Sequence, residues 1–179
     1  MSAWLVDLGP VEYRKAWDLQ KALVERRAAD AIPDTLLLLE HPHVITLGRR
    51  GRMEDVVDRS VPGHEGVLAV FDVERGGEAT YHGPGQLVGY PILKMKDRLD
   101  VRKLVTDVEE VLIRSARDFG VEAGRSEAQR GVWVHGRKLA SIGFAVHALV
   151  TYHGFAHNVG TDLAWFERIR PCGNEGRVK

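Results

Sequence analysis

Apolar side chains recur with the period of an α-helix in two segments of the chain. The clearer pattern runs from Val101 to Phe119, where Asp100 suits an N-cap and Gly120 marks the end. The other pattern covers Glu12 to Ala28, and Pro33 follows it. Both segments are predicted to be amphipathic helices that place one face on a hydrophobic core.

Short runs of apolar and β-branched residues between and after these helices predict strands. The predicted strands are Leu36 to Glu40, Val44 to Gly48, Val67 to Val73, Gln86 to Leu93, Val132 to His135, Lys138 to Val146 and Thr151 to Val159. The pair His135-Gly136 predicts a tight hairpin turn between two of them. Because the strands follow one another without strict alternation with helices, the pattern favours an α+β domain. We expect a mixed, largely antiparallel sheet flanked by helices.

The composition is that of one globular domain, which we expect to cover residues 1–179. Basic and acidic residues number 25 each, so the surplus of positive charge that a nucleic-acid partner requires is missing. No apolar run has the length of a membrane helix, and the first residues do not resemble a signal peptide. We therefore expect a cytoplasmic protein that binds neither nucleic acid nor a membrane.

The densest group of glycines and polar side chains extends from Arg75 to Gln86, between two predicted strands. Gly76 and Gly77 allow close approach of the backbone to a ligand, and the segment also supplies a cation, a hydroxyl, an imidazole and an amide. We interpret this segment as a ligand-binding loop. The alternative is a long connection with incidental polar residues. The spacing of its glycines does not fit a dinucleotide-binding loop.

The single cysteine, Cys172, lies between Pro171 and Gly173, which suit a turn that presents the thiol. A cysteine nucleophile needs a nearby cation or base, because a free thiol is mostly protonated at neutral pH. Lys138 is a candidate for that role. The alternatives are an idle loop cysteine and a lysine at a solvated strand end. His153 and His157 lack a third ligand at a zinc-like spacing, so we expect no metal, and no cofactor motif is present.

Four blocks resemble, in order, the signature of the lipoyl(octanoyl) transferases (LipB). They are RGGEATYHGPGQLVGYPI (Arg75 to Ile92), GRKLASIGF (Gly136 to Phe144), YHGFAHNV (Tyr152 to Val159) and PCGNEG (Pro171 to Gly176). HPHVITLGRR (His41 to Arg50) is also similar to the N-terminal pattern of that family. The resemblance implies a fold similar to the catalytic domain of biotin and lipoate protein ligases. It further implies transfer of an octanoyl group from acyl carrier protein to a lysine of lipoyl domains, in 2-oxoacid dehydrogenases and the glycine cleavage H protein.

The same resemblance implies roles for individual residues. Cys172 matches the nucleophile of the family and Lys138 its catalytic lysine. The matched acyl-binding residues are Arg75, Gly76, Gly77, Glu78, Ala79, Thr80, Tyr81 and His82; Ser141, Ile142 and Gly143; and Gly154, Phe155 and Ala156. An ammonium at Lys138 would favour the Cys172 thiolate. Since the family commonly continues beyond the position of Lys179, we expect that a C-terminal segment is missing.

Two other functions are compatible with parts of this pattern. An ATP-dependent lipoate ligase of the same superfamily would use Lys138 to bind phosphate or adenylate oxygens and would need no nucleophilic cysteine. The PCG sequence and the RGGEATYH form of the loop argue against it. A non-catalytic acyl-binding module would leave Cys172 without a role.

Overall fold

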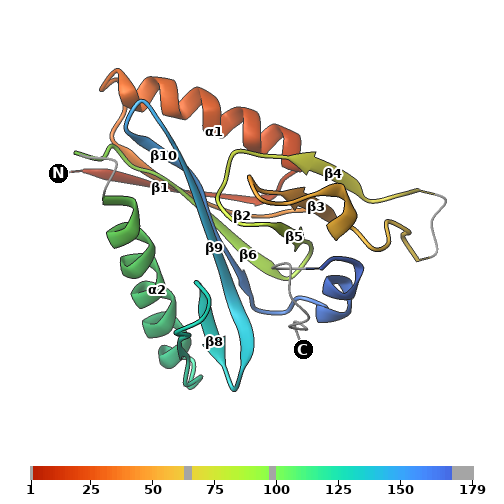
Figure 1. The fold of residues 1–179 in the computed structure, drawn as a ribbon. Coiled ribbons are helices and arrows are strands. Elements are labelled where there is room, and N and C mark those ends of the chain that lie inside the picture. The colour runs from red at the N-terminus through yellow and green to blue at the C-terminus, as the bar shows by residue number, and fades with distance from the viewer. Residues whose placement is uncertain (1, 63–65, 97–99, 171–179) are drawn as a thin grey trace.

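A seven-stranded sheet forms the centre of the protein (Figure 1). The computed structural model describes residues 2–62, 66–96 and 100–170. In spatial order the strands are β1 (Ala3–Pro10), β2 (Asp34–Glu40), β6 (Gln86–Ile92), β10 (Val150–Asn158), β9 (Arg137–His147), β8 (Val132–Val134) and β7 (Gly124–Arg125). β1 and β2 run parallel, and the other neighbouring pairs are antiparallel. The predicted α+β class and the largely antiparallel sheet are confirmed.

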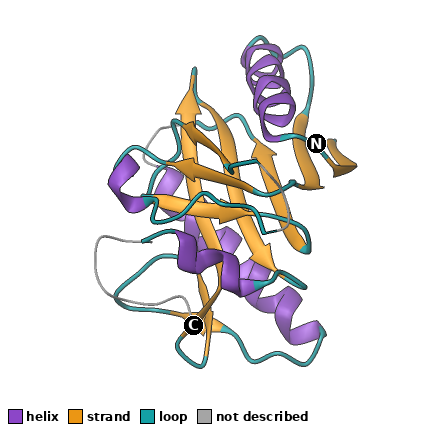
Figure 2. Cartoon of the chain, turned by 90° about the vertical axis from the view of Figure 1, so that its right-hand side faces the viewer, coloured by secondary structure: helices purple, strands orange, loops and turns teal. Residues whose placement is uncertain are grey.

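The two α-helices of the described residues flank the strands (Figure 2). Helix α1 (Tyr13–Ala28) buries Ala16 and Val24 against β6 and β10. Helix α2 (Asp100–Asp118) buries Val108 and Leu112 against β8 and β9. The apolar periodicity predicts both helices with nearly these bounds, and the predicted apolar faces are the ones that pack on the sheet. Within the described part of the chain, no helix is both long enough and apolar enough to span a membrane.

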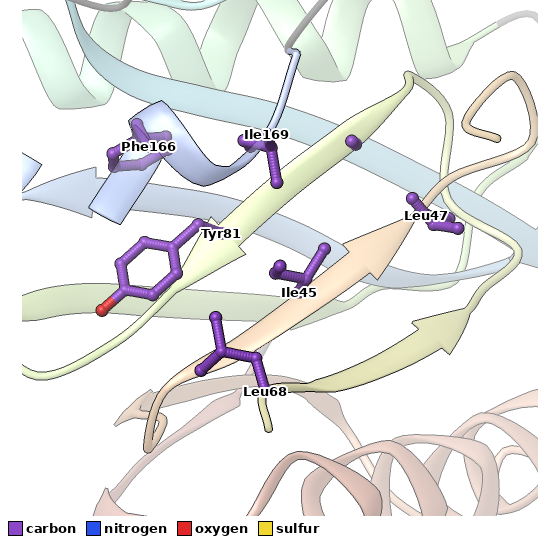
Figure 3. Close-up of a cluster of buried hydrophobic side chains, with 7 residues drawn as sticks. Ile45, Leu47, Leu68, Tyr81, Phe166 and Ile169 are labelled. Carbon is purple, nitrogen blue, oxygen red and sulfur yellow. The ribbon is translucent and has the colours of Figure 1, made fainter. Parts of the chain in front are cut away.

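A second, three-stranded sheet carries one wall of the candidate site. β3 (Val44–Leu47) lies between β4 (Ala69–Asp72), to which it is parallel, and β5 (Ala79–His82), to which it is antiparallel. Two short 3₁₀ helices, η1 (Met53–Asp55) and η2 (Leu163–Arg168), complete the described elements. Phe166 of η2 packs on Ile45 and Tyr81 of this sheet, as Figure 3 shows. The cluster fixes η2 to the small sheet.

The sequence prediction missed β1, β5 and the short β7. β1 is an edge strand whose Trp4 and Leu5 are 49% and 68% exposed, so it lacks a clean alternation of buried and exposed positions. The prediction of an uninterrupted loop from Arg75 to Gln86 is wrong at Ala79–His82. This segment pairs with β3, and its Thr80 and Tyr81 are good strand formers.

Candidate active site

A cavity of about 750 Å³ opens among the loop before β5, strands β9 and β10, and the start of α2. Its volume is in the range of small-molecule sites. Predicted site residues that line it are Lys138, Arg75, Gly76, Gly77, Glu78, Ala79, Thr80, His82, Ser141, Ile142, Gly143, Gly154, Phe155 and Ala156. Segments far apart in the sequence therefore meet at one place. Cys172 lies outside the described residues.

Tyr81 is the one predicted site residue, among those described, that does not line the cavity. Its ring stacks on Trp165 with 5.6 Å between centroids, and its hydroxyl lies 2.6 Å from Nδ1 of His43. Thr80 and His82 line the cavity. The Tyr81 side chain instead packs with Phe166 of η2 (Figure 3). Tyr81 therefore supports the segment that leads to Arg170. The amide of Arg170 donates to the Asp55 carbonyl at 2.7 Å, which anchors that segment.

The loop before β5 is held by its own arginine. The Arg75 guanidinium donates to the carbonyls of Thr46 at 2.8 Å, Gly76 at 3.1 Å and Glu78 at 2.9 Å. Its Nη2 also donates to the Thr46 hydroxyl at 2.8 Å. Gly77 has a φ of 95°, a conformation that favours glycine. The Arg75 guanidinium, which we expected to bind a ligand, thus also holds the loop in place through these hydrogen bonds.

Strand β9 packs so closely on this loop that a side chain would not fit at Gly143. A Cβ atom there would lie 2.7 Å from the Gly76 carbonyl oxygen. The Gly76 amide donates to the Phe144 carbonyl at 3.0 Å, which fixes the approach. Glycine at position 143 is therefore required for the contact between two walls of the cavity.

Lys138 follows the predicted turn at His135-Gly136. Both turn residues have positive φ, 47° and 75°, which is the type I′ geometry of two-residue hairpins, so this prediction is confirmed. The turn pairs Lys138 with Trp133 across the two strands. The Lys138 ammonium lies 4.8 Å from the Trp133 ring centroid, an attractive cation–π distance. The side chain is half-buried at the cavity and is not a fully solvated strand end.

Three buried histidines lie at the cavity: His82 and His153 line it, and His41 contacts the His82 ring. Burial lowers the pKa of His41 to about 4, and its Nε2 lies 2.7 Å from the Tyr90 hydroxyl. Burial also lowers the pKa of His153 to about 4, although its hydrogen bond to Glu74 acts in the opposite direction. The pKa of His82 lies well below its usual value because of burial, and the nearby His41 and Arg75 lower it further. These imidazoles are therefore neutral at pH 7.

Some residues at the cavity were not singled out from the sequence. Trp133 and Asn158 line it, and His153 adopts a φ of 56° within β10, which is unusual for a residue with a side chain. Asn158 lies in one of the blocks that resemble the transferases, and its polar side chain at the end of an apolar strand was the available signal. Among the described residues, no three His, Cys, Asp or Glu side chains gather as a metal site would require.

Comparison with protein families gives one match that covers most of the chain. The model of the lipoyl protein ligase A/B catalytic domain matches residues 12–179. The chain belongs to this family. The family resemblance found in the sequence is thereby confirmed.

Relatives of similar sequence are named octanoyltransferases, which supports a transferase activity for this chain. The chain is 51% identical to the probable octanoyltransferase of Pyrobaculum calidifontis, over 94% of this chain and 69% of that protein. It is 50% identical to the octanoyltransferase of Syntrophotalea carbinolica, over 95% of this chain and 78% of the relative. The prediction of an octanoyltransferase, which is an acyltransferase enzyme, is confirmed by these relatives.

Solved structures of the family confirm the fold. A lipoate-protein ligase A bound with ATP superposes with a TM-score of 0.69 and 19% identity, covering 94% of this chain and 75% of the other. A bipartite lipoate protein ligase from Thermoplasma acidophilum gives a TM-score of 0.71 and 20% identity, over 98% and 68% of the two chains. At these identities the likeness establishes the architecture alone.

Proposed function

We propose that the chain transfers an octanoyl group from the thioester of acyl carrier protein to a lysine of a lipoyl domain, through a thioester on Cys172. The observation that supports this proposal is the position of Lys138 in the cavity shared by the three acyl-binding segments. A lysine beside an acyl pocket suits proton transfer and stabilisation of a thiolate. Protein acceptors fit a family whose members act in lipoylation.

In the first half-reaction the Cys172 thiolate attacks the carbonyl carbon of the donor thioester. A new carbon–sulfur bond forms, the old one breaks, and the donor thiolate leaves with a proton from Lys138. The Gly76 amide already donates to Phe144, so of the two loop glycines Gly77 is the candidate donor to the oxyanion. The octanoyl group then remains on Cys172 as an activated thioester.

In the second half-reaction the amine of the acceptor lysine attacks the Cys172 thioester. An amide bond forms, Cys172 leaves as a thiolate, and neutral Lys138 takes the proton that the amine releases. The enzyme returns to its starting state, and one octanoyl group has moved without any nucleotide. Two half-reactions through one cysteine predict ping-pong kinetics.

The cavity supplies the apolar contact that an eight-carbon chain requires. Ile142, Phe155 and Ala156 contribute apolar surface to it. Burial of roughly seven carbons at ~0.8 kcal/mol each gives an upper limit of about 5–6 kcal/mol for recognition of the chain. That is enough to select an octanoyl donor over a short acyl donor.

Intact-protein mass spectrometry tests the covalent step directly. After mixing with octanoyl-acyl carrier protein and no nucleotide, the chain should gain one octanoyl mass. The sequence contains one cysteine, so loss of the adduct in Cys172→Ser locates the bond. Circular dichroism should show that the variant is folded, and its transfer activity should be abolished.

Two experimental outcomes would contradict this proposal. A folded Cys172→Ser variant that retains most of the transfer rate would exclude Cys172 as the nucleophile. Strict dependence of transfer on ATP and magnesium would make the chain a lipoate ligase, in which Lys138 binds the adenylate.

A further inference from the structure

A row of hydrogen-bonded side chains runs along the cavity wall from His82 of β5 to the backbone of Lys138 in β9. Nδ1 of His82 lies 2.7 Å from Oε1 of Gln86. Nε2 of Gln86 donates to Oδ1 of Asn158 at 2.9 Å, and Nδ2 of Asn158 donates to the Lys138 carbonyl at 3.4 Å. Gln86 and Asn158 are direct partners in the pairing of β6 with β10, so the sheet register brings their side chains together.

The row continues from His82 into the loop that lines the cavity. Nε2 of His82 lies 3.5 Å from the Thr46 hydroxyl, a long contact. That hydroxyl in turn accepts hydrogen bonds from Arg75, from Nη2 at 2.8 Å and from Nε at 3.3 Å. Hydrogen-bonded groups therefore connect the loop of Arg75 with the strand of Lys138.

The direction of each hydrogen bond follows from the main-chain carbonyls, which can only accept. The Lys138 carbonyl requires the amide nitrogen of Asn158, so the Asn158 oxygen must face Gln86. Gln86 then presents its nitrogen, which also lies 3.4 Å from the Tyr81 carbonyl. The oxygen of Gln86 consequently faces His82, and Nδ1 of His82 must carry the proton.

The surroundings of His82 favour a neutral ring. Arg75 donates to the Thr46 hydroxyl, which leaves that hydroxyl free to donate its own proton to the lone pair of Nε2. The His41 and Tyr13 rings lie 5.8 Å and 6.0 Å from the His82 ring. Burial, followed by the nearby His41 and Arg75, lowers the pKa of His82, and these effects outweigh the hydrogen bond to Gln86, which raises it.

We propose that Gln86 and Asn158 are positioning residues of the transfer reaction. They select the tautomer of the His82 ring, which burial keeps neutral, with its proton on Nδ1, and they join the backbone at Lys138 to the acyl-binding loop. The distance between the lysine and the loop is thereby fixed. His82 acts as a hydrogen-bonding bridge and carries no proton to or from the substrate. This inference rests on the proposed function, since it assumes that Lys138 takes part in transfer.

Two isosteric substitutions each remove one hydrogen-bond donor from this row without changing the volume of the side chain. In Gln86→Glu a carboxylate cannot donate to Asn158 or to the Tyr81 carbonyl, and it favours a second proton on His82. In Asn158→Asp a carboxylate cannot donate to the Lys138 carbonyl. Each variant should lower kcat for octanoyl transfer about tenfold or more, with little change in KM, because misplacement of a reacting group affects the transition state.

The protonation state of His82 is the measurement that distinguishes a positioning role from a nonspecific loss of structure in the variants. Nuclear magnetic resonance of ¹⁵N-labelled histidine should show a protonated Nδ1 and an unprotonated Nε2 in the wild type from pH 6 to 8. Gln86→Glu should convert His82 to the doubly protonated ring. Gln20→Glu is the matched control, since Gln20 is equally buried and uses its oxygen to accept from the His153 amide. This variant should leave the His82 tautomer unchanged. Its kcat should stay within about twofold of the wild-type value.

The wild-type spectrum needs no variant, so the proposal stays testable if Gln86→Glu fails to fold. A wild-type His82 with its proton on Nε2 would overturn it. So would folded Gln86→Glu and Asn158→Asp variants with normal kcat. Octanoylation of Cys172 is measured in the same samples: its absence from the wild type would reject the proposed function, whereas normal acylation with unaffected variants would reject the positioning role alone.

Discussion

Lys138 is the side chain whose charge bears most directly on the proposed nucleophile. Lys138→Met keeps an unbranched side chain that is one atom shorter, and it removes the ammonium that lies 4.8 Å from the Trp133 ring centroid. The pH midpoint of Cys172 alkylation should therefore move upward, because a thiolate without a nearby cation is less stable. Alkylation rates measured against pH would show this shift.

Lys103→Met provides the control for that experiment. Lys103 is exposed on α2 and pairs with Asp107, outside the cavity lining. Its removal should leave the alkylation profile unchanged. An unchanged profile in Lys138→Met as well would mean that Lys138 does not tune the thiol.

The buried histidines predict a loss of stability in mild acid. The pKa values of His41 and His153 are about 4 in the folded protein, below the usual value near 6.5 of an unfolded chain. Between these two values the unfolded state binds more protons, so the free energy of unfolding should fall as the pH decreases from about 6.5 to 4. Each histidine contributes on the order of 3 kcal/mol to this fall.

Urea unfolding at pH 7 and pH 5 measures the effect. His41→Gln cannot titrate, so this variant should be less stable at pH 7 but should lose less stability on acidification. If the wild type is equally stable at both pH values, His41 and His153 are not held neutral by the fold.

At the level of elements, the contact between β9 and the loop before β5 sets the shape of the cavity. Gly143→Ala would place a Cβ atom 2.7 Å from the Gly76 carbonyl, where backbone atoms must move. Overpacking of this kind should cost about 1–3 kcal/mol of unfolding free energy and should also reduce octanoyl transfer. Thermal unfolding and transfer rates test both effects.

Gly124→Ala is the control for the glycine contact. Gly124 lies in β7, and a Cβ atom there would meet nothing within 4 Å. That variant should match the wild type in activity and stability. Full activity in Gly143→Ala would show that the loop and β9 can separate without effect on the cavity.

The elements that could be predicted from the sequence are those with a strong local signal. The stripe of α2 and the His135-Gly136 turn carry their structure in neighbouring residues. The exposed edge strand β1 and the short β5 depend on their partners β2 and β3, which local periodicity does not identify.

The candidate site divides in the same way. Gly76, Gly77 and Lys138 were candidates from residue chemistry and from motif resemblance, Gly143 and Gly154 from resemblance alone, and all five line the cavity. The link between Gln86 and Asn158 depends on the register of β6 against β10, which no short motif specifies. Sequence therefore predicted the parts that face a substrate better than the groups that support them.

At the scale of the whole molecule, the neutral chain presents a local basic group at the cavity. The amides of Arg49 and Arg50 donate to the carbonyls of Arg75 and Gly77, so these arginines lie beside the proposed acyl-binding loop. The Arg50 side chain is 73% exposed. Arg50 makes a long ion pair with Glu78 at 3.7 Å, whereas Arg168 is held by shorter contacts to Asp58 and Ser60. The exposed pair is the better candidate for steering an acidic donor protein.

Reversal of both charges, Arg49→Glu with Arg50→Glu, should mainly raise KM for octanoyl-acyl carrier protein. The effect should shrink as salt increases, because screening shortens to ~10 Å at 0.1 M. Activity on a small octanoyl thioester should fall much less than activity on the protein donor. Arg26→Glu with Arg117→Glu makes the same change of charge on α1 and α2 away from the cavity, and should leave KM unchanged. Equal losses on both donors would contradict docking.

The position of β10 between β6 and β9 has a consequence for synthesis on the ribosome. β1, β2 and β6 are complete once Ile92 has emerged, but the neighbour of β6 extends from Val150 to Asn158. The nascent chain therefore carries an open, largely apolar strand edge while α2, β7, β8 and β9 are made. Open edges of this kind recruit other strands and aggregate. Protection by chaperones matters most during this interval, and the enzyme has no complete cavity until the interval ends.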